Sequence, residues 1–377
     1  MAGTARRKGR AVPLATRLLA ARPVRTAAGA LGVGLALMLI LLLSGLWAGV
    51  QQRVTVYEDH LGAGLVVVPP GTESLFADPG ALPAAAADAI RRTPGVDAAD
   101  PVRTLYLILE LPHGKAAVAA VASDPGRPGG PWALVAGRPP QAVDEVALDA
   151  VFAGEHGLVI GDHLPVLGHR MTVAGLTDDT TMFMTPLLFT TTDAMTGMLR
   201  ATGTTGSVLV TLSPGADPAA VRTQLTRSGL TVRTPAQLHE AALTLATRIY
   251  GSPVRLMVGV AFVAGTLIVA LVAHTRVTEQ QRELGILKAM GATPGRLRRI
   301  AVAETAALTG LGAVAALVLM LLARQVLTWW WPAFPVAVTT ATVVAAAVAA
   351  VAMALVAAWL PARRLARLDP VTAFRSR

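Results

Sequence analysis

Four long runs without a charged residue constrain the fold of this 377-residue chain more than any other feature. They lie at 27–50, 256–273, 305–323 and 334–360. A helix needs about 20 apolar residues to cross the hydrocarbon core of a bilayer, so each run predicts a transmembrane helix. The first run is longer than the apolar part of a signal peptide, and no small-residue cleavage site follows it. We therefore expect it to be retained, with cleavage as the alternative.

Basic residues flank these runs unevenly and orient them. Segments 1–26, 276–299 and 361–377 together hold 18 Lys and Arg against 3 Asp and Glu, whereas residues 51–250 hold 13 against 19. The positive-inside rule then predicts a multi-pass protein of the plasma or inner membrane, with both termini in the cytoplasm and the acidic segment outside. A nucleic-acid-binding protein gathers its basic residues on one folded surface, so no nucleic acid partner is expected.

These features predict an α-helical membrane protein with four transmembrane helices and a large mixed α/β domain inserted between helices 1 and 2. The segments are a basic cytoplasmic N-terminus (1–26), transmembrane helix 1 (27–50), a two-lobed extracytoplasmic α/β domain (51–252), transmembrane helix 2 (253–275), a cytoplasmic helix and turn (276–299), transmembrane helix 3 (300–325), a short outer loop (326–333), transmembrane helix 4 (334–360) and a basic cytoplasmic tail (361–377). The chain has no cysteine, so the outer domain holds together without disulfides.

Short apolar runs separated by turn residues give the outer domain its mixed character. Strands are expected at 63–71, 102–111, 115–123 and 207–212, and helices at 81–93 and 217–229. A spacer rich in Gly and Pro at 124–131 precedes a β-rich stretch at 144–179. This order predicts two lobes, one of them inserted in the other.

Small residues recur at helix spacing within the first two spans. Gly45 and Gly49 form a G-x-x-x-G pair, and Ala261 and Gly265 form a similar one. Such faces let helices approach closely, either at a seam with a second copy of the chain or in ordinary packing within one bundle. Both interpretations stay open. Tryptophans at 47 and 329–331 are expected to anchor the spans at the outer interface.

The helix expected at 277–290 has an unusual face. On a helical wheel that face carries Glu279, Glu283, Leu284, Ile286, Leu287 and Met290. A helix lying on an anionic leaflet would carry basic residues beside its apolar side chains. Carboxylates there suit a groove on a partner protein that supplies basic residues. Gly291 is expected to end this helix, and Thr293 with Pro294 to begin the next.

The stretch RELGILKAMGATPGRLRRI (282–300) closely resembles the cytoplasmic signature of FtsX-like, or MacB-type (type VII), ABC transporter permeases. The tail PARRLARLDPVTAFRSR (361–377) resembles the ending of that family, and the order of one span, outer domain and three spans is also similar to it. Residues 45–76 further resemble the subgroup of DevC-like and haem-efflux permeases.

The resemblance implies a permease subunit that works as a homodimer with two copies of a separate cytoplasmic ABC ATPase. ATP hydrolysis would drive mechanotransmission and efflux of a hydrophobic or amphipathic substrate from the outer leaflet. The preferred candidate substrate is haem or another toxic compound, and the second candidate is a glycolipid or lipopeptide. The residues implied in coupling to the ATPase are Glu279, Arg282, Glu283, Leu284, Gly285, Ile286, Leu287, Lys288, Met290 and Gly291.

The sequence supports a separate ATPase. It contains no G-x-x-x-x-G-K-[ST] phosphate-binding motif; Gly114 and Lys115 are adjacent, but Leu109 occupies the earlier glycine position. We expect no enzyme activity and no cofactor in this chain, with ATP and Mg bound by the partner. Two alternatives remain: a non-transporting signal transmitter that activates an extracytoplasmic protein, and a lipoprotein-releasing permease.

Three polar residues just outside the first span are candidate substrate contacts. Tyr57, Glu58 and His60 could ligate haem iron or hold a polar headgroup, although an ordinary polar stalk is the more common explanation. Met182 and Met184 could also ligate haem, but we expect them to fill core gaps.

The remaining candidates are expected to be structural. His156, His163 and His169 have irregular spacing, are expected at the surface, and predict no metal site. Glu304 and His274, near the cytoplasmic ends of their spans, are also expected to serve structure. Glu304 is expected either to complement the N-terminal dipole of its helix or to pair with a neighbouring basic residue.

Overall fold

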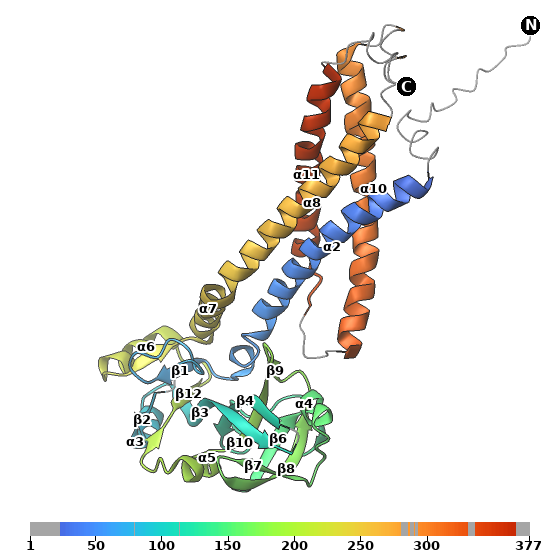
Figure 1. Cartoon of the computed structure of the whole chain (residues 1–377). Helices are drawn as coiled ribbons and strands as arrows, with labels where there is room; N and C mark the ends of the chain where they lie inside the picture. The colour runs from blue at the N-terminus through green and yellow to red at the C-terminus, as the bar shows by residue number, and fades with distance from the viewer. Residues whose placement is uncertain are drawn as a thin grey trace, which may run out of the picture. The chain divides into compact units, whose positions relative to one another are not determined.

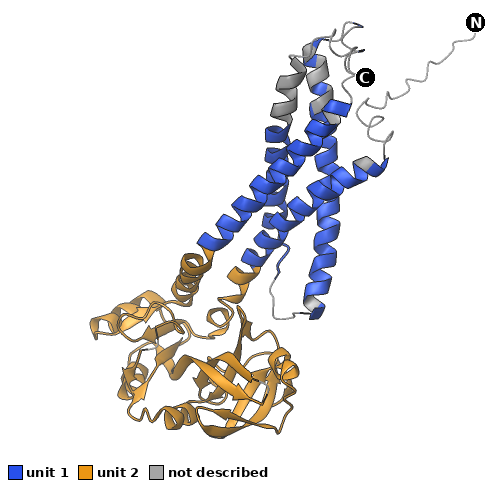
Figure 2. Cartoon of the chain, viewed as in Figure 1, with its two compact units in different colours: residues 1–48, 252–330, 336–377 blue, residues 49–251, 331–335 orange. Residues whose placement is uncertain are grey.

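The computed structural model describes residues 23–78, 80–112, 114–279, 286, 290, 293–330 and 336–366. The chain divides into two compact units (Figure 2). The helical unit holds residues 1–48, 252–330 and 336–377, and the outer unit holds 49–251 and 331–335. Among the described residues, four helices are long and apolar enough to cross a membrane. They are α2 (Pro23–Arg53), α8 (Ser252–Glu279), α10 (Pro294–Trp330) and α11 (Thr340–Ala366). The predicted fold class is confirmed.

All four helices of the helical unit contribute to one apolar core. Val33 and Leu37 of α2 lie in it with Val269 of α8, Met320 of α10 and Met353 of α11. Small residues on facing helices permit this approach, as the sequence predicts. Gly265 shows how close the approach is, because a Cβ added there would lie 2.7 Å from Cε of Met353.

The last helix starts later than the predicted span, at Thr340 and not at residue 334. A reciprocal cap explains the start. Thr339 Oγ1 accepts from the backbone N–H of Thr342 at 3.2 Å, and Thr342 Oγ1 accepts from the N–H of Thr339 at 3.0 Å. Ala337 just before it donates its N–H to the carbonyl oxygen of Gly45 at 3.0 Å, so this segment pairs with α2 and is not helical.

The outer unit is built on a single mixed sheet (Figure 1). Its strand order is β13-β1-β12-β3-β4-β10-β6-β8-β5, with β7 paired to β8 and β9 paired to β10. The strands are β1 (Leu65–Val68), β3 (Val96–Leu111), β4 (Gly114–Ser123), β5 (Leu134–Gly137), β6 (Glu145–Asp149), β7 (His163–Val166), β8 (His169–Thr177), β9 (Thr181–Met182), β10 (Thr185–Thr191), β12 (Ser207–Leu212) and β13 (Thr231–Arg233). A separate pair joins β2 (Leu82–Pro83) to β11 (Thr204–Thr205). The β4–β10 and β6–β8 pairs are parallel, and the others are antiparallel.

Short helices cover this sheet. They are α3 (Ala85–Arg91), α4 (Ala150–Glu155), α5 (Thr192–Leu199), α6 (Pro218–Arg227) and α7 (Pro235–Ala246). Asp217 caps α6 as predicted, its Oδ1 accepting from the N–H of Ala219 at 3.0 Å. The sequence did not indicate α4, which is short and has no helical periodicity. It begins where Asp149 accepts two backbone N–H groups.

Successive side chains of β3 point to opposite faces of the sheet. Leu107, Leu109 and Leu111 pack into the core beneath β4, β6, β8 and α5. Tyr106 projects to the other face, as successive strand residues must. The sheet runs without interruption from β13 to β5, so the division into two lobes stays a prediction.

Candidate functional site

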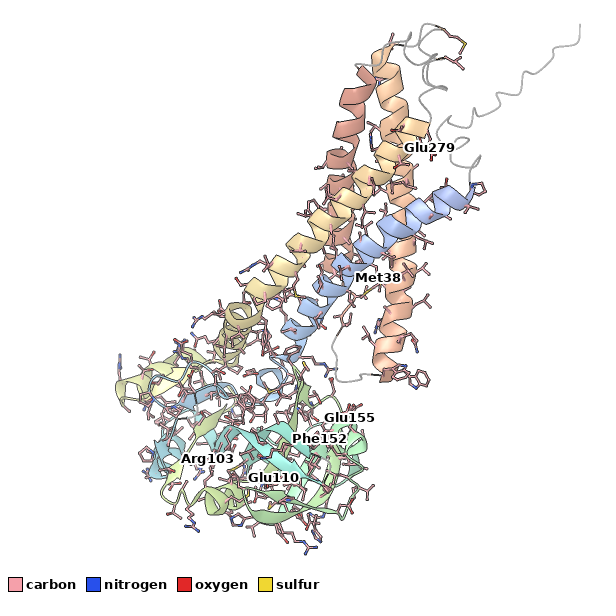
Figure 3. The ribbon with its side chains drawn as sticks, in the orientation of Figure 1. Met38, Arg103, Glu110, Phe152, Glu155 and Glu279 are labelled. Carbon is pink, nitrogen blue, oxygen red and sulfur yellow. The ribbon has the colours of Figure 1, made fainter. Side chains whose placement is uncertain are left out.

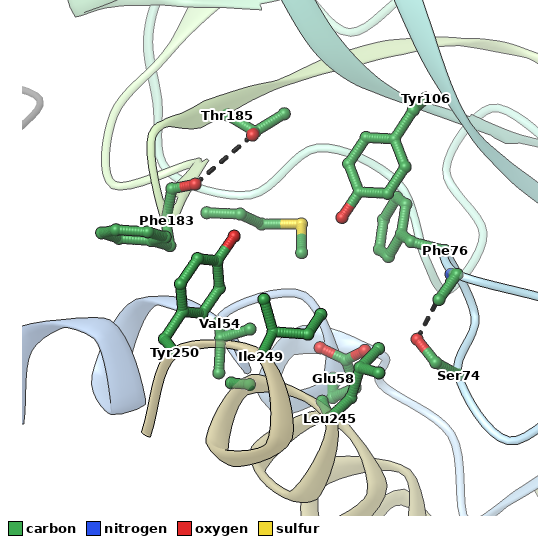
Figure 4. Close-up of a pocket in the computed structure, with 14 residues that line it drawn as sticks. Val54, Glu58, Ser74, Phe76, Tyr106, Phe183, Thr185, Leu245, Ile249 and Tyr250 are labelled. Atoms are coloured by element: carbon green, nitrogen blue, oxygen red, sulfur yellow. Dashed lines mark hydrogen bonds between the residues drawn. The ribbon is translucent and has the colours of Figure 1, made fainter. Parts of the chain in front are cut away.

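A cavity of about 300 Å³ lies within the outer unit (Figure 4). Its walls come from the turn after α2, the segment 74–77, β3, the β9–β10 hairpin and the helical segment ending at Gly251. The principal lining side chains are Glu58, Phe76, Tyr106, Phe183, Ile249 and Tyr250. Three of them, Tyr106, Ile249 and Tyr250, are 52%, 53% and 39% exposed and form an apolar mouth. The volume stands at the lower end of the usual range for small-molecule sites, about 300–1,000 Å³.

Glu58 opens a short 3-10 turn, η1 (Glu58–His60), that is fixed to α7. Thr55 Oγ1 donates to Asp59 Oδ2 at 3.1 Å. The other carboxylate oxygen of Asp59 lies 2.7 Å from Nδ1 of His239 on α7. Because Asp59 is held from both sides, the preceding side chain, Glu58, is directed into the cavity.

The neighbours of Glu58 also anchor the turn and do not line the cavity. Tyr57 is fully buried, and its hydroxyl donates to the carbonyl oxygen of Gly129 at 3.3 Å. The ring of His60 stacks on Trp132 with centroids 4.3 Å apart. The structure therefore separates the three predicted substrate residues. Of them, only Glu58 faces the cavity.

The helical wall is formed by α7 and the turn that continues it. A capping box at Thr234 and Gln237 starts α7, and the π-helical turn η2 (Thr247–Gly251) follows the helix directly. A π-helical turn is rare and shifts the side-chain register of a helix, often at a functional site. Here it places Ile249 and Tyr250 at the cavity.

The β9–β10 hairpin forms the wall next to η2. Met182 pairs with Thr185 across a tight turn whose second residue, Met184, has a φ of +53°. Met182 is buried and lines the cavity, as the predicted core role implies, whereas Met184 is 56% exposed. The ring of Phe183 contacts that of Tyr250 edge to face, with centroids 5.2 Å apart.

Tyr106 and Phe76 complete the aromatic lining. The segment carrying Phe76 is held to β3 by a hydrogen bond from the Thr104 hydroxyl to the carbonyl oxygen of Leu75. The two rings lie with centroids 5.7 Å apart. Burial raises the pKa of the Tyr106 phenol, and the charge of Glu58 raises it further. Tyr106 therefore stays neutral and available for hydrogen bonding at physiological pH.

The carboxylate of Glu58 is the unusual group in this site. The residue is 4% exposed, and its Oε2 has no hydrogen-bond partner within the part of the chain that the structure describes. Among the described residues that line the cavity, Glu58 alone has a carboxyl group, and none is basic. Burial raises the pKa of this carboxyl to about 8, so it is mainly protonated at neutral pH while nothing compensates its charge. Figure 4 shows the carboxylate, with the hydroxyl groups of Tyr106 and Tyr250, pointing into the space that these residues enclose.

The four residues predicted to lie at a seam with a second copy are buried by other parts of the same chain. Gly45, Gly49, Ala261 and Gly265 are all buried within the single chain. At Gly45 an added Cβ would lie 3.2 Å from the carbonyl oxygen of Ala337. This arrangement favours packing within one bundle, and a seam with a second copy stays a prediction.

Most of the predicted ATPase-coupling residues lie outside the described residues. These are Arg282, Glu283, Leu284, Gly285, Leu287, Lys288 and Gly291. Glu279 ends α8 (Figure 3), and Ile286 and Met290 are 42% and 71% exposed. The backbone N–H of Met290 donates to the carbonyl oxygen of Ile286 at 3.0 Å, which is helical spacing. The coupling role stays a prediction.

The other candidates offer no second site. Within the described residues, no group of three or more His, Asp or Glu side chains could hold a metal ion. His156 contacts the ring of Phe152, and His163 lies 3.1 Å from Thr172 Oγ1. Glu304 is buried well inside α10, which begins at Pro294. The expected interaction with that helix's N-terminal dipole is therefore wrong, because such effects fade beyond the first turn.

The comparison with protein families agrees with this architecture. Residues 255–370 match the profile described as "FtsX-like permease C-terminal", and residues 26–228 match "MacB-like periplasmic core domain". The second match alone covers more than half of the chain. The chain belongs to the FtsX-like, MacB-type family of ABC transporter permeases. Members of this family partner with an ABC ATPase, and the permease subunits typically lack ATPase activity.

Two solved structures of outer domains are among those similar to this MacB-type permease. The periplasmic region of MacB from Actinobacillus actinomycetemcomitans is 12% identical, with a TM-score of 0.38, over 48% of this chain and 92% of that one. The extracellular domain of the noncanonic ABC-type transporter YknZ from Gram-positive bacteria is 12% identical, with a TM-score of 0.34, over 46% and 99%. Both scores fall below the level that establishes a shared fold. No curated protein matches the chain.

Sequence reasoning missed most of the cavity wall of this permease. One signal was available, because the chain contains only three tyrosines. Tyr106 and Tyr250 line the cavity, and Tyr57 packs edge to face on Phe76, which also lines it, with centroids 5.4 Å apart. Their sequence positions alone do not show that they converge.

Proposed function

We propose that this MacB-type permease exports an amphipathic substrate, and that ATP hydrolysis by a separate subunit changes the shape of the Glu58 cavity. The family membership supports the ATPase partnership. The cavity is the observation that favours efflux over signalling alone, because a transmitter needs a surface for a partner protein and no apolar pocket.

The path of the chain supports mechanotransmission. Two of the places where the backbone passes between the helical unit and the outer unit are residues 48–49 and residues 251–252. The first passage leads into the turn that carries Glu58, and the second comes directly after Ile249 and Tyr250. A movement of α2 or α8 would therefore be transmitted through the backbone to two walls of the same cavity.

The same geometry limits the choice of substrate. The Tyr57 hydroxyl is buried in a hydrogen bond to the backbone, so it is a poor iron ligand in this conformation. Haem as a substrate would need other ligands. A small amphipathic molecule, or the polar end of a larger one, fits a mainly apolar cavity with one carboxylate.

Docking on the ATPase can be tested by replacing Leu284, Leu287 and Met290 together with Asp. Because these apolar side chains are predicted to fill a groove on the ATPase, the triple variant should stay in the membrane but lose co-purification with that subunit. Cells that express it should also retain more rhodamine 6G, a cationic amphipathic dye, than cells that express the wild-type pair.

A matched control is available on the outer unit. Val135, Val143 and Val159 are about as exposed as Met290, at 58%, 61% and 60%, and their replacement by Asp should leave both readouts unchanged. Full ATPase association of the Leu284, Leu287 and Met290 variant would exclude the docking role. Equal dye retention with and without the wild-type pair would exclude efflux of this probe class.

A further inference from the structure

The Glu58 cavity combines a buried acid with an aromatic enclosure. The carboxylate is 4% exposed, and its Oε2 has no hydrogen-bond partner among the described residues. Removing a carboxylate from water without a compensating partner costs several kcal/mol, and this burial raises the pKa of Glu58 to about 8. Without a ligand the carboxyl is therefore mainly protonated at neutral pH, and a bound positive charge would favour its ionised form.

The composition of the cavity wall indicates the charge of the missing partner. No Lys, Arg or His is present among the described residues that line the cavity. An anion would be repelled by Glu58 and would meet no basic group. A neutral molecule would leave the Glu58 carboxyl protonated and would gain nothing from its charge. A cation would favour the ionised carboxylate and pair with it in a region of low local dielectric, where the attraction is strong.

The aromatic side chains provide a second recognition element for the same charge. Phe76 and Tyr106 lie on one side of Glu58, and Phe183 and Tyr250 lie on the other (Figure 4). The negative faces of aromatic rings attract an organic ammonium, which is how proteins commonly recognise substituted ammonium groups. The phenol oxygens can also accept hydrogen bonds from an N–H group.

A metal ion does not fit this arrangement. Hard cations need several oxygen ligands, and the described lining supplies one carboxylate among mainly apolar side chains. Leu245, Ile249 and Ala246 supply apolar surface beside the carboxylate. The cavity therefore matches a molecule that joins a charged head to a short apolar body.

We propose that this cavity binds an organic monocation with an apolar body, its ammonium group against Glu58 and the aromatic rings. The proposal rests on the proposed export function, because it names the chemical class of the substrate that the cavity admits. Ile249 and Tyr250 directly precede α8 in the chain, so a bound cation would contact a wall that the backbone joins to α8.

The test uses the full-length chain in zwitterionic nanodiscs without the ATPase. Hexyltrimethylammonium is titrated by calorimetry and compared with 1-hexanol and hexyl sulfate, which share the apolar chain but carry no charge or a negative one. Empty nanodiscs correct for partition into lipid. We expect the cation to bind at least tenfold more tightly than the alcohol, and the sulfate not to bind.

The variant Glu58→Gln keeps the side-chain volume and removes the charge. It should lose at least tenfold in affinity for the cation and keep its affinity for 1-hexanol. Glu155→Gln, on the exposed surface of α4 (Figure 3), is the matched control and should bind as wild type does. If Glu58→Gln does not fold, the order of the affinities of the three ligands for the wild-type protein still tests the proposal.

Equal affinities for the cation and the alcohol, or unchanged cation binding in a folded Glu58→Gln variant, would overturn the proposal. These outcomes are separable from failure of the proposed function, because binding is measured without ATPase. A permease that co-purifies with its ATPase and exports rhodamine 6G, but does not bind hexyltrimethylammonium more tightly than 1-hexanol, would keep the export function and lose this cavity as the site that selects cations.

Discussion

Glu58 and Asp149 are two carboxylates of the outer unit, and they are buried alike, at 4% and 2% exposed. Their partners differ completely. Asp149 Oδ1 accepts the backbone N–H groups of Val151 and Phe152 at 3.0 and 3.2 Å, and its Oδ2 accepts the hydroxyl of Thr180 at 2.9 Å. The Glu58 Oε2 has no partner among the described residues.

This difference separates two roles for a buried acid. Asp149 starts α4 and joins it to the loop after β8, so its hydrogen bonds stabilise the fold. Glu58 faces a cavity and contributes little to the fold through its Oε2. Asp100 is an intermediate case: its Oδ2 also has no partner among the described residues, but the guanidinium of Arg127 lies 3.7 Å from its Oδ1. Burial alone therefore does not identify a ligand-binding carboxylate; the missing partner and the cavity do.

The largest effect is expected from Asp149→Ala. The substitution removes a helix cap, typically worth about 1 kcal/mol, and leaves the Thr180 hydroxyl and two backbone N–H groups without this acceptor. We expect a loss of about 2–4 kcal/mol and a fall of roughly 5–10 °C in the thermal unfolding midpoint of the detergent-solubilised chain.

Asp217→Ala is the control for this measurement, because Asp217 caps α6 at an exposed position. It should cost about 1 kcal/mol. If Asp149→Ala costs no more than Asp217→Ala, the buried network around Asp149 does not stabilise the fold as the hydrogen bonds imply.

A smaller, pH-dependent effect is expected at Glu145. Hydrogen bonding from the Arg138 guanidinium, and then from the N–H groups of Gln141 and Ala142, lowers the pKa of Glu145 to about 2. Since the folded-state pKa is below the unfolded value of about 4.3, this group stabilises the fold above pH 4.3. The contribution is lost as the pH falls towards 2. Between pH 5 and 2, wild type should therefore lose stability more steeply than Glu145→Gln.

Glu110→Gln is the comparison for that titration, because the ion pair of Glu110 with Lys115 is exposed at the end of β3 (Figure 3). Exposed pairs of this kind contribute little. The unfolding midpoint of Glu110→Gln should change with pH as that of wild type does. Parallel curves for Glu145→Gln and wild type would show that the Arg138 pair does not stabilise the fold.

The sequence predicts the membrane part of this protein well, because the thickness of the bilayer fixes both the length and the hydropathy of a span. It also predicts those strands of the outer unit that are continuous apolar runs, such as β1 and β4. The very short strands β2, β9 and β11 carry no pattern of their own. β2 and β11 form by pairing with each other from distant parts of the chain, and β9 forms only through its tight hairpin with β10.

The site is less predictable for the same reason. The polar residues after the first span draw attention to Glu58, but they group it with Tyr57 and His60, which are its neighbours only in sequence. On a tight turn, adjacent side chains point in different directions, and here two of the three anchor the turn. The true neighbours of Glu58 in the cavity, Tyr106 and Tyr250, come from a distant strand and a helical turn.

The smallest effect on stability, and the most direct test of the account, is expected from Glu58→Gln. At neutral pH the substitution replaces an acid that burial keeps mainly protonated by raising its pKa to about 8, so the variant should be as stable as wild type or up to about 1 kcal/mol more stable. Hexyltrimethylammonium should raise the unfolding midpoint of wild type and leave that of Glu58→Gln unchanged. A variant destabilised as strongly as Asp149→Ala, with no rise in the wild-type midpoint on adding the cation, would show that Glu58 is a structural acid and would contradict the account.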